Sequence, residues 1–303
     1  HISGILSTVR IGVRSLLQIA LVLAGFQLVG MVAGYVLGVV LVGLLGMRYL
    51  TVQYQRPTLN HFRRLFSFAK YAWLGSVRGR AYSEMDILVL GAFISSSLVG
   101  VYSVAWSLAA FLSLFGKSIM SAVFPEISKQ DVEQNQEAIR DLATEGLGFA
   151  GLITIPGLVG GLLLADQLLL IYGTDFTRGS AVLPVLIGAV LINEYQSQCM
   201  NVLNAIDRPD LSFKVNAAFL GSNLILNIIL IWQYKMIGAA FATLISASLG
   251  LILSFWLVSR QVKFRIPITR IIQQGTAAIA MGILVYAGQG LFEILGITEN
   301  TTF

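Results

Sequence analysis

Of the 303 residues in this chain, 56% are hydrophobic and only 12% are charged, which excludes an ordinary water-soluble protein. The mean hydropathy of +0.80 indicates that most of the chain lies in lipid. The net charge of +5 does not indicate a nucleic-acid partner, because the Lys and Arg residues are spread over connections between apolar segments. We therefore predict an all-α integral membrane protein, built as a multi-pass helical bundle.

Nine segments are long and apolar enough to cross a bilayer, because about 20 helical residues span its hydrocarbon core. The apolar run from Leu16 to Met47 is too long for one span, and we expect it to break near Gly25-Phe26-Gln27. In chain order, the expected helices lie at 7–25, 28–47, 65–90, 97–122, 146–164, 181–204, 213–232, 236–258 and 270–289. A tenth would begin at Leu291. Because the chain starts at His1 and stops soon after an apolar run, we expect it to be truncated at both ends.

The basic residues assign the connections to the two sides of the membrane, since cytoplasmic connections are enriched in Lys and Arg. Of the 20 basic residues, only Arg178 and Lys235 fall on the predicted outer side, and four lie within spans. The other 14 lie on the predicted cytoplasmic side: Arg10, Arg14, Arg48, Arg56, Arg63, Arg64, Lys129, Arg140, Arg208, Lys214, Arg260, Lys263, Arg265 and Arg270. A single helix over Leu16–Met47 would place Arg10 and Arg14 outside, so this asymmetry favours two helices.

Two further patterns concern local structure. Gly30, Gly34 and Gly38 recur every fourth residue, which predicts a helix face that a neighbouring helix approaches closely. The longest connection, from Pro125 to Glu145, is acidic, and we expect it to lie in the cytoplasm and to form a short polar helix.

The expected span at 65–90 carries five charged residues, Lys70, Arg78, Arg80, Glu84 and Asp86. Lys70 lies near the cytoplasmic end and can reach the interface, which leaves four at membrane depth. Charged side chains at that depth are costly and normally face a polar cavity or a charged partner. Arg80 and Glu84 are four residues apart and can pair on one helix face. In the alternative, 78–86 is an outer loop, but the remaining 65–77 is then too short to cross. We therefore favour a cavity.

Polar stripes mark two later spans. Amide and carboxylate side chains can bind sugar hydroxyls in a wet cavity, or they can bond to neighbouring helices. The sequence does not decide between these roles for the amides, whereas the ionisable Glu194 favours a functional one. The stripes are Glu194, Gln198 and Asn201 on the span at 181–204, and Asn216, Asn223 and Asn227 on the next.

Seven segments occur in a fixed order: Leu65–Lys70, Met85–Gly91, Val99–Ala105, Leu114–Ser128, Tyr172-Gly173, Ala181–Leu186 and Asn204–Pro209. From about residue 60 onward, the chain resembles the oligosaccharide (polysaccharide-biosynthesis) flippases of the multidrug/oligosaccharidyl-lipid/polysaccharide superfamily. Its sequence around Arg78-Gly79-Arg80 and Asn204–Pro209 is most similar to that of archaeal members. A proline common early in the first helix of the second lobe is missing here, where Lys70-Tyr71-Ala72-Trp73 stands.

The resemblance implies a two-lobed fold, of which this chain holds a part. Residues 1–47 would be the last two helices of the N-terminal lobe, and 48–64 a cytoplasmic connection. Residues 65–258 would be a six-helix C-terminal lobe, and 259–303 the start of an extra helix pair.

The resemblance also implies a flippase that moves a lipid-linked oligosaccharide across the cytoplasmic membrane by alternating access, not an enzyme. We expect no catalytic residues, no metal and no cofactor, with Na+ or H+ left open as a coupling ion. Expected partners are membrane lipid, a polyprenyl- or dolichyl-linked oligosaccharide, and glycosyltransferases of the same pathway. The alternatives are a drug/cation antiporter of the same superfamily, which two arginines in the cavity argue against, and a membrane glycosyltransferase or polymerase.

Residue roles follow as hypotheses. Arg78 and Arg80 would hold the carrier's phosphate, because guanidinium groups match phosphate oxygens. The other expected substrate-binding residues are Asp86, Glu194, Gln198, Asn201, Asn216 and Asn223. Glu84, Asp86 and Glu194 are the expected ion-pair or coupling residues.

Overall fold

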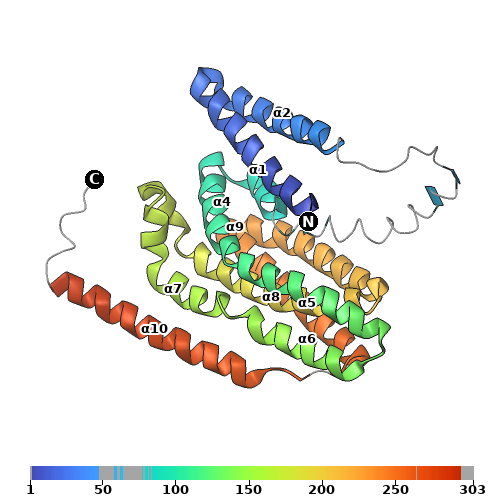
Figure 1. The fold of residues 1–303 in the computed structure, drawn as a ribbon. Helices are drawn as coiled ribbons and strands as arrows, with labels where there is room; N and C mark the ends of the chain where they lie inside the picture. Colours follow the sequence, from blue (N-terminus) through green and yellow to red (C-terminus); the bar gives the residue numbers. More distant parts are fainter. Residues whose placement is uncertain are drawn as a thin grey trace. The chain divides into compact units, whose positions relative to one another are not determined.

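A computed structural model of the chain describes residues 2–47, 58–59, 62–63, 77, 79–80, 82, 84–263 and 265–294. Over these residues every regular element is helical (Figure 1). The chain divides into two compact units, residues 1–62 and 63–303, which are described separately below.

The first unit is a helical hairpin. Helix α1 (Ile2–Leu21) passes through a short π-helical turn, η1 (Val22–Phe26), into helix α2 (Gln27–Met47) (Figure 1). The chain reverses where Gly25 and Gln27 adopt positive φ angles of 92° and 44°. Glycine adopts such angles at little steric cost, which explains the position of the turn. The predicted break near Gly25-Phe26-Gln27 is confirmed.

Glycines set the close approach of α1 and α2. A Cβ atom added at Gly34 would lie 2.7 Å from the Gln18 backbone, and one at Gly38 would lie 2.7 Å from Arg14 Cα. Carbon atoms do not approach so closely, so only glycine fits at these positions. The predicted close-packing face is therefore confirmed. By contrast, a Cβ at Gly43 would meet nothing within 4 Å.

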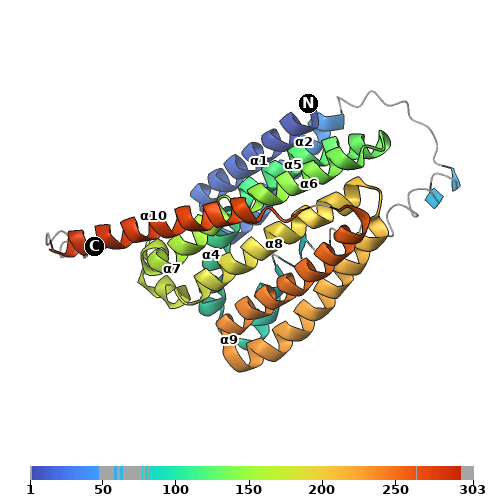
Figure 2. The ribbon, with the colours of Figure 1, turned by 90° about the horizontal axis from the view of Figure 1, so that it is seen from below.

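The second unit opens with a helical stretch at 84–93 and continues through seven helices and one short turn. These are α4 (Ser96–Phe111), α5 (Ser113–Val132), α6 (Gln136–Ala150), α7 (Thr154–Leu170), the 3₁₀ turn η2 (Thr174–Gly179), α8 (Val182–Ala205), α9 (Pro209–Gln261) and α10 (Ile268–Ile294). Helix α8 runs through the middle of the unit, between α5 and α6 on one side and α9 on the other (Figure 2).

Helix α9 contains two antiparallel halves. Its 53 residues reverse direction at Lys235, where φ is 53°. Beyond the turn, Gly238 packs directly on the backbone of Leu230, a contact that leaves no room for a side chain. The two predicted helices at 213–232 and 236–258 are therefore confirmed as the two halves of α9.

Five helical stretches in the described part of the chain are long and apolar enough to cross a membrane: Ile11–Leu44, Ser96–Val132, Gln136–Leu170, Pro209–Gln261 and Ile268–Gln289. The first and fourth each contain a reversal and can therefore cross twice. The expected span at 65–90 lies largely outside the described residues. A multi-pass, all-helical membrane protein is confirmed.

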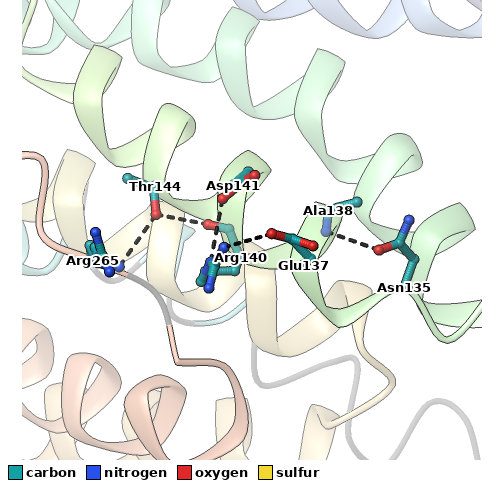
Figure 3. Close-up of polar contacts among 7 residues, drawn as sticks. All are labelled: Asn135, Glu137, Ala138, Arg140, Asp141, Thr144 and Arg265. Atoms are coloured by element: carbon teal, nitrogen blue, oxygen red, sulfur yellow. Dashed lines mark hydrogen bonds and ion pairs between the residues drawn. The ribbon is translucent and has the colours of Figure 1, made fainter.

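The segment from Pro125 to Glu145 is helical, as predicted, but it is not the long connection that we expected. Helix α5 continues through Pro125 to Val132, and α6 already begins at Gln136, so only a short turn separates them. Asn135 caps α6, because its Oδ1 accepts a 3.1 Å hydrogen bond from the Ala138 N–H (Figure 3). The polar residues here form helix well, so both helices extend beyond their apolar parts.

The interior of the second unit has two apolar clusters separated by polar residues of α8. One cluster uses Val182 to Val190 of this helix, with Tyr102 and Leu90. The other uses Cys199 to Ala205, with Ile127 and Leu147. The intervening Glu194, Gln196 and Gln198 are also buried. Polar side chains of α8 are therefore buried between the two apolar clusters.

Candidate functional site

Asp86 lies in the centre of a buried hydrogen-bonded cluster. Its Oδ2 accepts 2.6 Å bonds from the hydroxyl groups of Tyr102 on α4 and Thr243 on α9. Its Oδ1 accepts a 2.7 Å bond from Nδ2 of Asn227, which also donates to Asn223 Oδ1 at 3.1 Å. Asn223 in turn donates to Thr243 Oγ1 at 3.3 Å. All five side chains are at most 3% exposed. We call these five residues the Asp86 cluster.

Several helix segments bring the Asp86 cluster together at one depth. Asp86 lies seven residues before Phe93, and Tyr102 lies six residues after Ser96, where α4 begins. Asn227 and Thr243 each lie eight residues from the reversal at Lys235. At 1.5 Å per residue, all four lie about 10 Å below the predicted outer ends of their helices. On the predicted topology, the cluster would therefore lie in the outer third of the membrane.

The donors around Asp86 compensate in part for the burial of its carboxyl group, and none of them carries a positive charge. Among the residues that the structure describes, no Lys or Arg forms an ion pair with Asp86. A buried carboxylate without a counter-charge is costly, and three hydrogen bonds to it offset part of that cost. The Asp86 cluster therefore favours a positively charged guest.

Its oxygen atoms suit a small cation. Besides the two Asp86 oxygens, the cluster offers Asn223 Oδ1 and Thr243 Oγ1. It also offers Asn227 Oδ1, which is buried and has no hydrogen-bond partner among the described residues. Carboxylate, amide and hydroxyl oxygens are the ligands that hard cations prefer. One carboxylate supplies a single negative charge, which matches a monovalent ion or a proton.

The opposite face of the same helix is exposed. Arg80, Glu84 and Leu88 follow one another at intervals of four residues, and all three are exposed, whereas Asp86 and Leu90 are buried. Arg78 and its predicted role lie outside the described residues. Arg80 and Glu84 therefore share an exposed face, and Asp86 lies on a different, buried face of the same helix.

Glu194 occupies a second buried position, halfway along α8. It is 3% exposed, and its carboxylate packs against the backbone of Gly116 in α5, where any larger residue would collide with it. The partners of Asp86 lie on α4 and α9, so the structure does not bring the two carboxylates into one cluster.

The amides of the predicted stripes are buried as well. Gln198 and Asn201 are 3% exposed, and Asn216 is 7% exposed. Gln198 Nε2 and Asn216 Oδ1 are buried without a partner in the described part of the protein. A substrate-binding role for these residues and for Glu194 stays a prediction.

The sequence identified Asp86, Asn223 and Asn227 but not the hydroxyl groups that complete the cluster. Tyr102 and Thr243 are single hydroxyl residues on apolar helices, and nothing in their spacing sets them apart. The four-residue interval between Asn223 and Asn227 was the one usable signal, because it places both amides on one helix face.

An all-helical bundle with apolar membrane spans and a buried, hydrogen-bonded carboxylate defines a multi-pass membrane protein. More particularly, this chain belongs to the polysaccharide biosynthesis protein family, whose model matches residues 4–180. The predicted family is thereby confirmed, and the protein is a multi-pass protein of the cell membrane.

Two relatives come from the archaeon Haloferax volcanii. The "Probable flippase AglR" is 34% identical over 275 residues, which cover 90% of this chain and 58% of that protein. The "Probable low-salt glycan biosynthesis flippase Agl15" is 28% identical over 252 residues, covering 83% of this chain and 53% of that protein. The chain thus spans little more than half the length of these relatives.

Solved structures show the same fold. The lipid II flippase MurJ in its inward closed conformation superposes with a TM-score of 0.75 at 18% identity, covering 91% of this chain and 60% of that one. A MATE protein in the bent conformation gives 0.64 at 14% identity, covering 84% and 61%. The predicted partial fold of this superfamily is confirmed.

Proposed function

We propose that this chain is part of a flippase that moves a lipid-linked oligosaccharide from the cytoplasmic to the outer leaflet of the cell membrane. The family, and two relatives whose names describe flippases, support this function. The names of these relatives describe transporters, not glycosyltransferases or polymerases. The proposed substrate carries its glycan on a polyprenyl or dolichyl phosphate, and glycosyltransferases of the same pathway would be partners.

The observation that carries this proposal is the helix that contains Arg80 and Asp86, because it has one exposed face with Arg80 and one buried face with Asp86. By sequence, Arg80 lies about 20 Å from the end of this helix at Phe93, about two thirds of the way across the hydrocarbon core. Exposed charges at such depth face a polar cavity in membrane proteins, not lipid. We therefore assign the face of Arg80 and Glu84 to the substrate route of the whole protein.

Arg80 would hold the phosphate of the lipid carrier, because a planar guanidinium can donate two parallel hydrogen bonds to phosphate oxygens. Arg78 would assist it, as the sequence predicts. A cationic drug would be repelled by the same residues, so Arg80 favours the flippase over the drug/cation antiporter.

The Asp86 cluster would couple transport to an ion gradient. Asp86, Asn223, Asn227 and Thr243 supply the oxygen donors that would hold one Na+, and Asp86 alone could accept one proton. Ion binding would supply the driving free energy for alternating access. Because Arg80 and Asp86 share a helix, the closure of the Asp86 cluster can reposition the substrate face. Glu84 and Glu194 remain second candidates for coupling.

Deletion of the full-length gene tests this function. We expect the lipid-linked glycan to be made but to stay on the cytoplasmic leaflet, with the cell surface under-glycosylated. A gene encoding Arg80→Gln should fail to restore surface glycan at normal protein abundance. One encoding Arg178→Gln, an exposed arginine of η2, should restore it. Normal surface glycan together with raised drug sensitivity would instead support the antiporter.

A further inference from the structure

An apolar pocket lies at the predicted cytoplasmic end of the second unit, away from the Asp86 cluster. Its volume is about 660 Å³, and parts of α6, α7, α8, α9 and the start of α10 line it. The lining is aliphatic and aromatic apart from the hydroxyl groups of Tyr195 and Ser259. The volume falls within the range of ordinary ligand sites, and the lining would suit a hydrocarbon chain.

The pocket spans most of the depth of one membrane leaflet. Along α9, its lining residues run from Ser259, near the end of the helix at Gln261, up to Leu251. The eight-residue rise from Ser259 to Leu251 corresponds to about 12 Å, which is most of the roughly 15 Å depth of one leaflet. On the predicted topology, the pocket therefore extends from near the cytoplasmic surface toward the middle of the membrane.

Basic residues border the mouth of the pocket. The stretch Ser259–Arg270 contains Arg260, Lys263, Arg265 and Arg270 and no acidic residue, and all four are exposed. None of them forms an ion pair with a carboxylate in the described part of the chain. Their neighbours in sequence, Ser259, Ile266, Pro267 and Ile271, line the pocket.

Specific contacts hold this basic stretch against the pocket. The guanidinium of Arg260 lies 3.8 Å from the ring centre of Trp256, a lining residue. The backbone N–H of Arg265 donates to Thr144 Oγ1 of α6 at 3.4 Å (Figure 3). Nearly two turns into α10, Gln274 Nε2 donates to the Gly148 carbonyl at 2.7 Å. The orientation of the protein in the membrane explains why basic residues lie on the cytoplasmic side. It does not explain why they are held beside this pocket.

We infer that this pocket binds one anionic phospholipid of the cytoplasmic leaflet, with an acyl chain in the pocket and the phosphate among the basic residues at its mouth. Basic sites between membrane helices on the cytoplasmic side recognise anionic headgroups. The charge of the mouth selects an anionic lipid over a zwitterionic one, and the apolar lining accommodates the chain. This site is separate from the proposed transport function and would stabilise the junction of α9 and α10.

Tryptophan quenching by brominated lipids tests this site directly. Trp256 and Trp232 both lie on α9 and are 47% and 77% exposed, but only Trp256 lines the pocket. Two full-length proteins would each retain one of these tryptophans, with all others replaced by phenylalanine. They would be reconstituted into phosphatidylcholine vesicles containing a minor fraction of brominated phosphatidylglycerol or brominated phosphatidylcholine.

We expect brominated phosphatidylglycerol to quench Trp256 with at least about fivefold higher apparent affinity than brominated phosphatidylcholine, the preference that one interfacial cation supplies. Trp232 should show no such preference. Arg260→Gln/Lys263→Gln should abolish the preference at Trp256. The matched control Lys129→Gln/Lys214→Gln, which removes two cytoplasmic cations that do not border the pocket, should retain it.

Equal quenching of Trp256 by both lipids would show unselective boundary lipid and would overturn the inference. Absence of quenching by either lipid would show that protein covers the pocket, which would also overturn it. Relief of quenching by unbrominated polyprenyl phosphate would assign the pocket to the substrate carrier instead. If the single-tryptophan proteins fail to fold, native mass spectrometry of the wild type and the same charge variants gives the same comparison of bound phosphatidylglycerol.

Discussion

Replacing Asp86 with asparagine separates the charge of the Asp86 cluster from its hydrogen bonds. The new amide oxygen can still accept the bond from Asn227, and its NH2 group can donate to the hydroxyl of Tyr102 or Thr243, because hydroxyl groups both donate and accept. We therefore expect Asp86→Asn to fold and accumulate like the wild type. It should lose its response to the coupling ion, since the one carboxylate charge is gone.

Asp86→Ala should behave differently, because it removes the acceptor as well as the charge. The donors of Tyr102, Asn227 and Thr243 would be left unsatisfied in sites that are at most 1% exposed. Each such group costs about 1–3 kcal/mol, which gives a loss of about 3–9 kcal/mol in the free energy of unfolding. That is comparable with the whole stability of a typical protein. The exposed Leu88 on the same helix offers a control, and Leu88→Ala should change stability little.

Thermal unfolding of the purified full-length protein measures both effects. A ligand present at 100 times its Kd stabilises the folded state by about 2.7 kcal/mol. The wild type should therefore unfold at a higher temperature in sodium chloride than in choline chloride, or at lower pH if the ion is a proton. Asp86→Asn should show neither response. An unchanged ion response in Asp86→Asn, or normal abundance of Asp86→Ala, would refute the proposed cluster.

Three other predictions follow from the same structure. Arg80→Gln should abolish transport in the full-length protein without lowering its abundance. Arg80→Lys should restore transport only partly, because an ammonium cannot form a bidentate contact with phosphate. Wild-type transport by Arg80→Gln would exclude a phosphate-binding role. Gly34→Ala should lower the unfolding temperature by separating α1 from α2, whereas Gly43→Ala, with open space around its Cβ, should not; equal effects of both would argue against the packing. A cysteine at Gly173 should react with an impermeant reagent on intact cells and one at Gln261 only after permeabilisation, and the reverse pattern would contradict the assigned sides.

Much of the architecture could be predicted, because membrane insertion leaves a strong record in sequence. Two helices in the long apolar run from Leu16 to Met47 keep Arg10 and Arg14 on the cytoplasmic side, which is why we predicted a break. The reversal at Gly25 confirms it. The extension of α5 and α6 beyond the membrane could not be predicted in the same way. Their ends depend on helix propensity and on the Asn135 cap. The length of an apolar segment predicts neither of these.

The Asp86 cluster was only partly predictable for a different reason. An ionisable residue in a span indicates a functional site, and that argument identified Asp86. Its partners depend on which helix faces meet, and nearly uniform apolar helices give little periodicity from which to infer those faces. Tyr102 and Thr243 are 16 and 157 residues away along the chain, and only the folded bundle brings them together with Asp86.

Helix periodicity already placed Arg80 with Glu84 on one face and Asp86 on an adjacent strip, but it could not show which of the two faces would be buried. A cavity at one depth can be inferred from charges alone, but the packing of α4 and α9 against one side of the helix decides which charge is buried.

The most direct test of a flippase is to measure movement of the substrate by the full-length protein in vesicles. A fluorescent lipid-linked oligosaccharide would be placed in the outer leaflet, and the fraction protected from an impermeant quencher would be followed with time. We predict a protected fraction that rises much faster with the wild-type protein than in protein-free vesicles, and that does not rise with Arg80→Gln. Equal protection in wild-type and protein-free vesicles, under an imposed sodium or proton gradient of either direction, would contradict the proposed function.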